Sequence, residues 1–237
     1  MRRTGLLAVL LFTATLFLLA GLLPEEKTVP LTHTPWEVML NAEGDSQLLG
    51  ITLGKSRLSE AQLIWREQAE ITLFLPREAP AKVEAYFQQI NLGGIRASLV
   101  TEVQVEELRL QQIIDQGARI STQGDGSRKI TLDGEGVTIV EESPIVSLTY
   151  LPRSNLSTET LQNRFGPPAE TLLMATGTEH WLYPRIGLDI AISGQGREVF
   201  QFVPPHQFDR LRIPLQSEGR EGDAPELYGD STLASKL

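Results

Sequence analysis

The chain has 237 residues, a formal net charge of −9 at pH 7, a pI near 4.9 and no cysteine. The acidic balance argues against nucleic acid or an anionic membrane surface as a partner, because both require a basic face. The lack of cysteine excludes disulfides, lipid attachment through cysteine, thiolate metal sites and cysteine nucleophiles, so an apolar core alone must hold the fold together.

Residues 1–23 predict a transmembrane anchor. Arg2 and Arg3 precede an uncharged run over residues 5–23, close to the about 20 residues that a spanning helix needs. The positive charges before this run place the amino terminus in the cytoplasm and everything after Pro24 across the membrane. We therefore expect a single-pass protein of the bacterial inner membrane with its C-terminal domains in the periplasm. Cleavage of the run is the alternative, although residues 18–20 lack the small-x-small pattern of a cleavage site.

Residues 24–35 read as a polar linker, and residues 36–125 as a first α+β domain. Within this domain we expect Ser59 to cap a helix, with Gln62 reaching back in a capping box. A second helix has its apolar residues at helical spacing and ends at Gly117. The expected elements are, in order, strands 36–40 and 47–53, helix 58–68, strand 69–75, a hairpin of 82–89 and 95–101, and helix 103–115.

Residues 126–215 read as a second α+β domain, and residues 216–237 as a disordered tail. Here Ser157 opens a helix that runs through Phe165, and Gly166 supplies a left-handed cap. The strands around this helix are expected at 128–132, 137–142, 145–151, 170–174, 179–184, 187–193 and 197–203. Their alternation fits a helix that lies on one side of an antiparallel meander.

A weak internal repeat connects the two domains. The sequence "LSEAQL" at Leu58 parallels "LSTETL" at Leu156, and "VMLNAEG" at Val38 parallels "ITLDGEG" at Ile130. Chance similarity of short motifs is the alternative to a true repeat. The predicted fold class is therefore α+β, with short helices packed on one face of antiparallel sheets, in two sheet-and-helix domains after a transmembrane helix.

Catalytic signatures are missing from the sequence, which has no metalloprotease helix, nucleophile elbow, phosphate loop or dinucleotide fingerprint. His33, His180 and His206 lie far apart, without the spacing of a metal site. Asp189, one strand on, could orient His180 across a hairpin, but no serine or threonine is placed as a nucleophile. We predict no catalytic residue, no metal and no cofactor, and keep a periplasmic hydrolase using His180 and Asp189 as an alternative.

The stretch from Leu156 to Phe202 resembles the BamE (SmpA/OmlA) family of small envelope proteins. The resemblance rests on a helix that ends in Phe165-Gly166-x-Pro168, followed by Trp181-x-Tyr183 at the start of a meander. It implies a compact α+β domain with helices on one face of a three-stranded sheet, an architecture that the β-lactamase inhibitor proteins share in tandem. Leu22 stands where lipoproteins of this family carry a cysteine, which is a further reason to expect the inner membrane.

The sequence favours a non-enzymatic adaptor or scaffold that binds another envelope protein. The structural motif comprises Gly166, Pro168, Trp181 and Tyr183, which terminate the helix and pin it to the sheet. The expected interaction loop includes Met174, Thr176, Glu179 and His180. Its expected partners are an envelope protein and, through the N-terminal helix, the inner membrane. A binder of a small ligand or cell-wall fragment stays open, and would show a concave, aromatic-lined pocket of a few hundred cubic ångströms.

Overall fold

The computed structural model describes residues 34–92, 95–116, 119–124, 126–194 and 197–222. The predicted membrane span and most of the predicted linker lie outside these ranges. Within the ranges, no helix is both long and apolar enough to cross a membrane. All of the described residues belong to one compact unit, Leu31–Leu237.

The described elements are α+β in class, and all of the paired strands are antiparallel. The strands are β1 (Met39–Leu40), β2 (Ser46–Leu48), β3 (Ile51–Thr52), β4 (Glu70–Leu75), β5 (Lys82–Leu92), β6 (Ile95–Val103), β7 (Arg119–Thr122), β8 (Arg128–Thr131), β9 (Ile145–Pro152), β10 (Glu170–Leu173), β11 (Glu179–Tyr183), β12 (Leu188–Ile192) and β13 (Val199–Phe202). The α-helices are α2 (Leu58–Trp65), α3 (Glu107–Gln116), α4 (Gly134–Glu141), α5 (Thr158–Phe165) and α6 (Asp209–Gly222).

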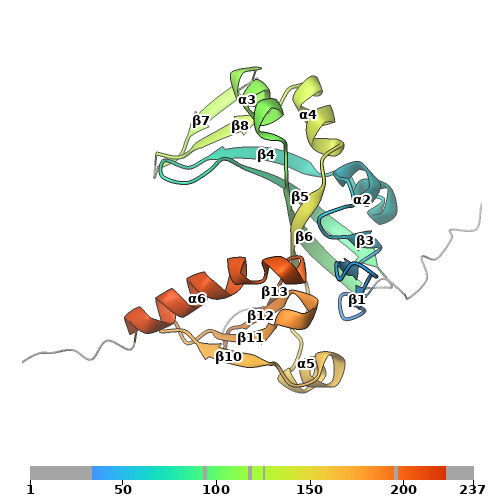
Figure 1. Cartoon of the computed structure of the whole chain (residues 1–237), viewed down its shortest axis with the longest axis vertical. Coiled ribbons are helices and arrows are strands. Elements are labelled where there is room, and N and C mark those ends of the chain that lie inside the picture. The colour runs from blue at the N-terminus through green and yellow to red at the C-terminus, as the bar shows by residue number, and fades with distance from the viewer. Residues whose placement is uncertain (1–33, 93–94, 117–118, 125, 195–196, 223–237) are drawn as a thin grey trace, which may run out of the picture. The chain divides into compact units, whose positions relative to one another are not determined.

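One large sheet connects the two halves of the chain. Its ten strands follow the order β10-β11-β12-β13-β9-β6-β5-β4-β8-β7, while β1, β2 and β3 form a small sheet of their own (Figure 1). Strand β9 is the link, because it pairs with β6 on one side and with β13 on the other. Strand β9 therefore joins the N-terminal strands to the C-terminal meander.

This sheet corrects the expectation of two separate domains. The expected boundary between residues 125 and 126 falls between β7 and β8, which pair with each other, and β8 pairs in turn with β4. A single cluster of buried apolar residues also runs from Leu48 to Phe202. Sequence patterning detects each meander but not the pairing of β6 with β9, because pairing partners leave no local signal.

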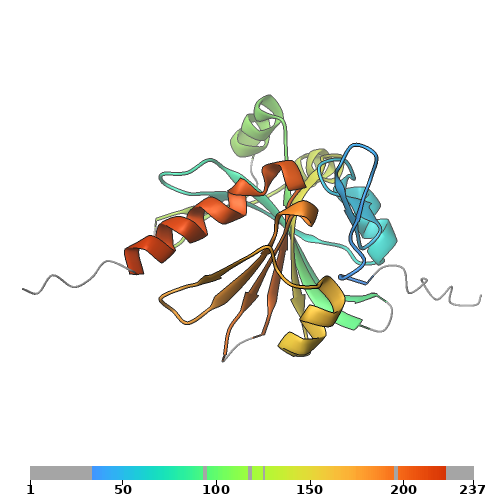
Figure 2. The ribbon, with the colours of Figure 1, turned by 60° about the horizontal axis from the view of Figure 1, so that its bottom comes forward.

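Helices cover both faces of the meander instead of one. Trp181 and Tyr183 of β11 join the large core on the side of α5, whereas Leu182 points to the other face. There Leu182 packs with Val203 and Phe208, and α6 lies against this small cluster (Figure 2). The alternating direction of strand side chains sends neighbouring residues to opposite faces, so each face needs its own apolar cover.

The predicted tail is corrected by α6, which extends to Gly222 and so includes residues 216–222. Leu211 and Leu215 pack against the small cluster, and the Gln216 amide donates to the Glu170 carboxylate at 3.3 Å. The interior proline Pro214 and the polar residues around it conceal the helical spacing in the sequence. Residues 223–237 lie outside the described ranges.

Two helix predictions also change. The expected strand at 137–142 is α4, which begins after Asp133, whose carboxylate accepts the Gly136 N–H at 2.7 Å. Periodicity alone cannot distinguish a strand from a helix in a short apolar run. The capping residue Asp133 is the sequence feature that indicates the helix. The expected Ser59 cap of α2 is wrong, because the helix begins earlier, with the Glu60 carboxylate accepting the Arg57 N–H at 3.2 Å.

Candidate functional site

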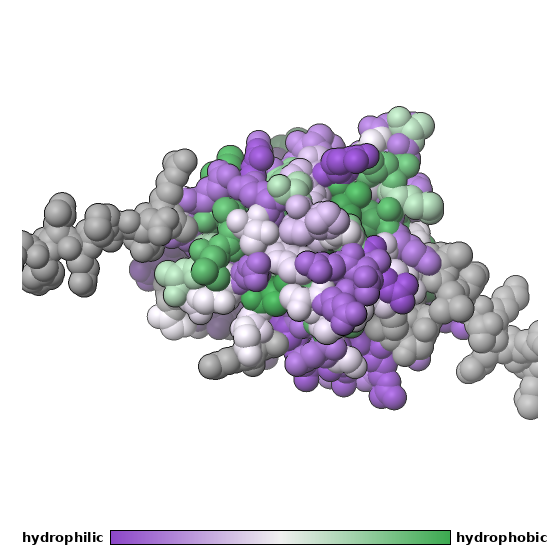
Figure 3. Space-filling model, turned by 90° about the horizontal axis from the view of Figure 1, so that it is seen from below, coloured by the Kyte–Doolittle hydropathy of each residue, from purple (hydrophilic) through white to green (hydrophobic). Residues whose placement is uncertain are grey.

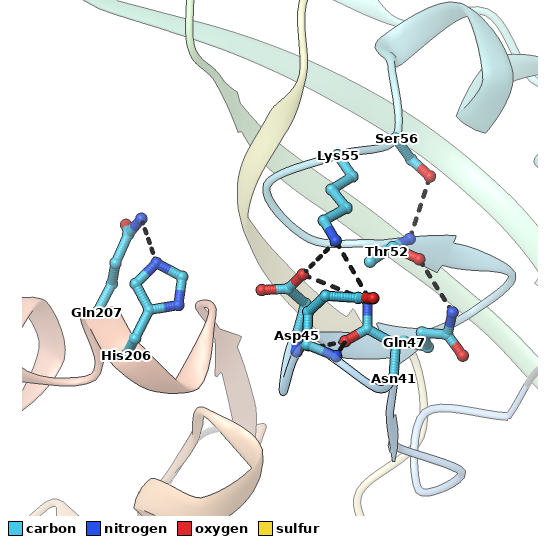
Figure 4. A network of polar contacts seen from close by, with 9 residues as sticks. Asn41, Asp45, Gln47, Thr52, Lys55, Ser56, His206 and Gln207 are labelled. Atoms are coloured by element: carbon cyan, nitrogen blue, oxygen red, sulfur yellow. Dashed lines mark hydrogen bonds and ion pairs between the residues drawn. The ribbon is translucent and has the colours of Figure 1, made fainter.

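Trp36 lies in the segment just before β1, the first strand of the small sheet. A polar network holds the turn between β1 and β2 (Figure 4). The Asn41 side-chain oxygen accepts the N–H groups of Glu43 and Asp45, and Lys55 Nζ lies 2.9 Å from the Asp45 carboxylate. The hydrogen bond from Lys55 holds the pKa of Asp45 below its ordinary value, and the same bond raises the pKa of Lys55. Both partners are thus held in their charged forms, which stabilises the turn between β1 and β2.

A pocket of about 470 Å³ opens where Trp36 meets the end of β9. Its lining comes from the segment before β1, from β6, from the end of β9 and from the chain between β9 and α5. The lining residues are Trp36, Arg96, Tyr150, Pro152, Arg153, Ser154 and Leu156. An aromatic and apolar wall with a few polar groups is the usual composition of a ligand pocket, and this volume lies in the range of about 300–1,000 Å³ that such sites occupy.

Three arginines surround this pocket. Arg96 and Arg153 line it, and the Arg164 guanidinium lies 4.8 Å from the centre of the Trp36 ring. The salt bridges of the described residues include none of these three. Glu198, which accepts the N–H of Leu156, is turned inward and buried. The pocket is therefore a cationic site on an acidic chain.

Tyr150 adds a polar group to the pocket wall. Only 2% of this residue is exposed, and its ring packs edge-on against Phe200 at 5.7 Å. The hydroxyl has no hydrogen-bond partner among the described residues, where Thr34 Oγ1 is the one enclosed side-chain oxygen without a partner. Tyr150 is one of the residues that line the pocket. Burial raises the pKa of Tyr150 to about 12, so the hydroxyl keeps its proton at neutral pH and can donate it in a hydrogen bond.

The predicted structural motif is formed as a helix-to-sheet clamp. The Tyr183 hydroxyl donates to the Gly166 carbonyl at 3.0 Å, and the Tyr183 ring lies 5.9 Å from that of Phe165. Ser157 caps α5 by accepting the Thr160 N–H, as the sequence predicts. Pro168 follows the end of this helix.

Gly166 differs in one respect from the expected left-handed cap. Its φ is +75°, but its ψ is −173°, a region that is essentially restricted to glycine. We expect Gly166→Val to lower the free energy of unfolding by more than about 1 kcal/mol, because a β-branched residue cannot relax there. Chemical denaturation of the full chain in detergent measures this. Asn163→Val, at an exposed position inside α5, is the control, and equal losses in the two variants would contradict the strain at Gly166.

His180 and Asp189 meet as the sequence suggested. They come from the paired strands β11 and β12, and the His180 Nδ1 atom lies 2.9 Å and 3.0 Å from the two Asp189 carboxylate oxygens. The Asp189 side chain is fully buried, and that of His180 is 12% exposed. Neither residue lines the Trp36 pocket, and among the described residues no hydroxyl is paired with His180. The arrangement orients an imidazole without supplying a nucleophile.

Most side chains of the expected interaction loop are occupied within the protein. Met174 is buried, Glu179 accepts the Trp181 indole N–H at 2.9 Å, and His180 is held by Asp189. Thr176 is exposed, and its hydroxyl donates to Thr178. The binding role of this loop stays a prediction, and the structure offers the Trp36 pocket as a better-formed site.

In the described part of the chain, neither a metal site nor a continuous apolar surface competes with the Trp36 pocket as a candidate site. No group of three or more histidine, aspartate or glutamate side chains is placed to hold a metal ion there. On the face in Figure 3, hydrophobic residues form separate patches divided by hydrophilic ones. The Trp36 pocket is therefore the candidate functional site.

The chain matches no known protein-family model, no curated protein and no solved structure. Its function has to be argued from the site itself.

Proposed function

We propose that this protein is a non-enzymatic, membrane-anchored binding protein of the bacterial periplasm, which acts as an adaptor or scaffold for another envelope protein. Residues 1–23 would anchor it in the inner membrane. The segments from α2 through β6 and from α5 through β13, each a helix followed by an antiparallel meander, would be diverged BamE-like copies within one sheet. The observation that carries the binding function is the aromatic and arginine-lined pocket at Trp36.

The composition of the pocket supports binding over hydrolysis. Trp36 supplies flat apolar contact area, and Arg96 and Arg153 supply hydrogen-bond donors with fixed charge. Tryptophan, tyrosine and arginine are the residue types that dominate binding energy at protein interfaces. The His180–Asp189 pair, on which the hydrolase alternative depends, lies on strands that do not contribute to this pocket.

Site-specific photo-crosslinking in intact cells tests the proposal. A photoreactive amino acid at Ser154, an exposed residue of the pocket, should give a discrete crosslinked envelope protein. The matched control is the same label at Ser121, exposed on the edge strand β7. We expect the Ser154 product to be absent at Ser121 and lost when Trp36→Ala is added. Equal products from the two positions, or none from Ser154, would contradict an adaptor that uses this pocket.

A binder of a small ligand or cell-wall fragment is the second candidate, favoured by the pocket volume of about 470 Å³. Such a ligand would occupy the same walls. The Ser154 label would then crosslink to a small molecule or to peptidoglycan, which mass spectrometry of the purified chain distinguishes from a protein adduct.

A further inference from the structure

We propose that the Trp36 pocket recognises a carboxylate that a peptide carries beside a flat or apolar group. This inference rests on the proposed function, because it takes the same pocket as the binding site. The carboxylate could belong to an acidic segment of an envelope protein or to the stem peptide of a cell-wall fragment. Both present the same chemistry to the pocket.

The first argument is the state of the arginines. Arg57, Arg109, Arg210 and Arg212 each form an ion pair with a carboxylate within the protein, whereas Arg96 and Arg153 form none within the described structure. The two residues are also adjacent, because the Arg153 N–H donates to the Arg96 carbonyl at 3.1 Å, so two cationic side chains without an ion pair line the same pocket. The planar guanidinium fork matches the geometry of a carboxylate, which it can bind through two parallel hydrogen bonds.

The second argument is the Tyr150 hydroxyl. Tyr150 lines the same pocket and is 98% buried, and its hydroxyl takes part in none of the hydrogen bonds of the described residues. Because β9 and the Phe200 contact hold its ring in place, the hydroxyl is a preorganised donor. A carboxylate has lone pairs for such a donor in addition to the two arginines.

The third argument is the apolar part of the lining. Trp36, Pro152 and Leu156 offer carbon surface beside the charged groups, and Arg164 steadies the Trp36 ring at 4.8 Å by a cation–π contact. A free inorganic anion would leave this surface wet. A peptide with a carboxylate next to an apolar side chain covers this carbon surface and binds the arginines at the same time.

Calorimetric titration of the full chain in detergent with two matched probes tests this chemistry. N-acetyl-L-tyrosine carries the carboxylate, and N-acetyl-L-tyrosine amide differs from it at that group alone. We expect the acid to bind at least about tenfold more tightly than the amide, in line with charge-assisted hydrogen bonds. Equal binding of the two probes, or stronger competition by inorganic phosphate than by acetate, would overturn the proposal.

Variants assign the preference to the named side chains. Arg153→Gln and Tyr150→Phe should each weaken binding of the acid several-fold and leave the amide unchanged, while Arg96→Lys, which keeps the charge but loses the fork, should also weaken the acid. Arg119→Gln on β7 is the control, because Arg119 is exposed and does not line the pocket. If Arg119→Gln weakened binding of the acid as much as Arg153→Gln does, the preference for the acid would depend on the net charge of the protein and not on the pocket, which would overturn the proposal.

The two candidate sources and the two proposals are separable. Competition against N-acetyl-L-tyrosine by a peptidoglycan disaccharide tetrapeptide or by a synthetic glutamate-rich peptide shows which carboxylate the pocket prefers, and a preference for either supports it. If Ser154 crosslinks to a protein but the pocket does not prefer the acid probe, the adaptor function is supported and carboxylate recognition is overturned. If the pocket prefers the acid probe but Ser154 gives no protein crosslink, carboxylate recognition is supported and the adaptor function is overturned.

Discussion

Replacement of Gly187 by alanine is expected to lower the free energy of unfolding by more than about 3 kcal/mol. Gly187 ends the short 3-10 turn at Pro184–Ile186 with φ +68°, and its carbonyl accepts the Val203 N–H at 2.9 Å. A Cβ atom at this position would overlap the Val203 carbonyl oxygen, which is backbone and cannot rotate away. The turn and the end of β13 would have to separate, and the core beside Leu188 would open with them.

A matched variant separates this overlap from backbone strain. Gly166 also has a positive φ, but a Cβ there would meet no atom within 4 Å. We expect Gly166→Ala to cost only about 1–2 kcal/mol, the strain of the backbone alone. Urea denaturation of both variants, followed by circular dichroism, gives the difference. Similar losses in the two variants would show that the close approach of Gly187 to Val203 is not rigid.

The sequence predicts best those elements that carry their own end signals. The α5 helix was expected from Ser157 through Phe165, and the structure confirms it because the Ser157 hydroxyl accepts the Thr160 N–H. The apolar residues of α4 were predicted to form a strand at 137–142, because Asp133 was not recognised as the cap of a helix. A helix was therefore predicted correctly where its capping residue was recognised, and was missed where the cap was not recognised.

Long-range pairing is the part of the fold that the sequence does not show. The hairpins β5–β6 and β11–β12 are expected from alternation, since their strands are neighbours in the chain. The pairing of β6 with β9 brings Leu99 next to Tyr150, across a stretch that includes α3 and α4. No local pattern specifies this partner, so two domains were predicted where one sheet exists.

The candidate site was hidden for the same reason. Trp36 was expected in a strand, and Arg96 and Arg153 come from separate segments that meet only because β6 lies beside β9. A free arginine is also invisible in sequence, because its lack of a partner is a property of the folded surface. His180 and Asp189, in contrast, lie on successive strands of one meander, so their contact could be foreseen.

The His180–Asp189 pair gives the second large expected effect. We expect His180→Leu alone to lower the free energy of unfolding by about 3 kcal/mol, because it leaves the fully buried Asp189 carboxyl without the partner that binds both of its oxygens. The double variant His180→Leu with Asp189→Leu should recover most of this loss, since two apolar side chains then occupy the site without an unmet polar group.

This pair of variants also decides between a structural and a functional role. Thermal denaturation of the two variants beside the native chain measures the coupling. If the pair only stabilises the meander, the double variant should fold and keep the full Ser154 crosslink, because Trp36 and Tyr150 are untouched. A double variant that melts like the native chain but loses the crosslink would place His180 and Asp189 in the function, and would return the hydrolase to consideration.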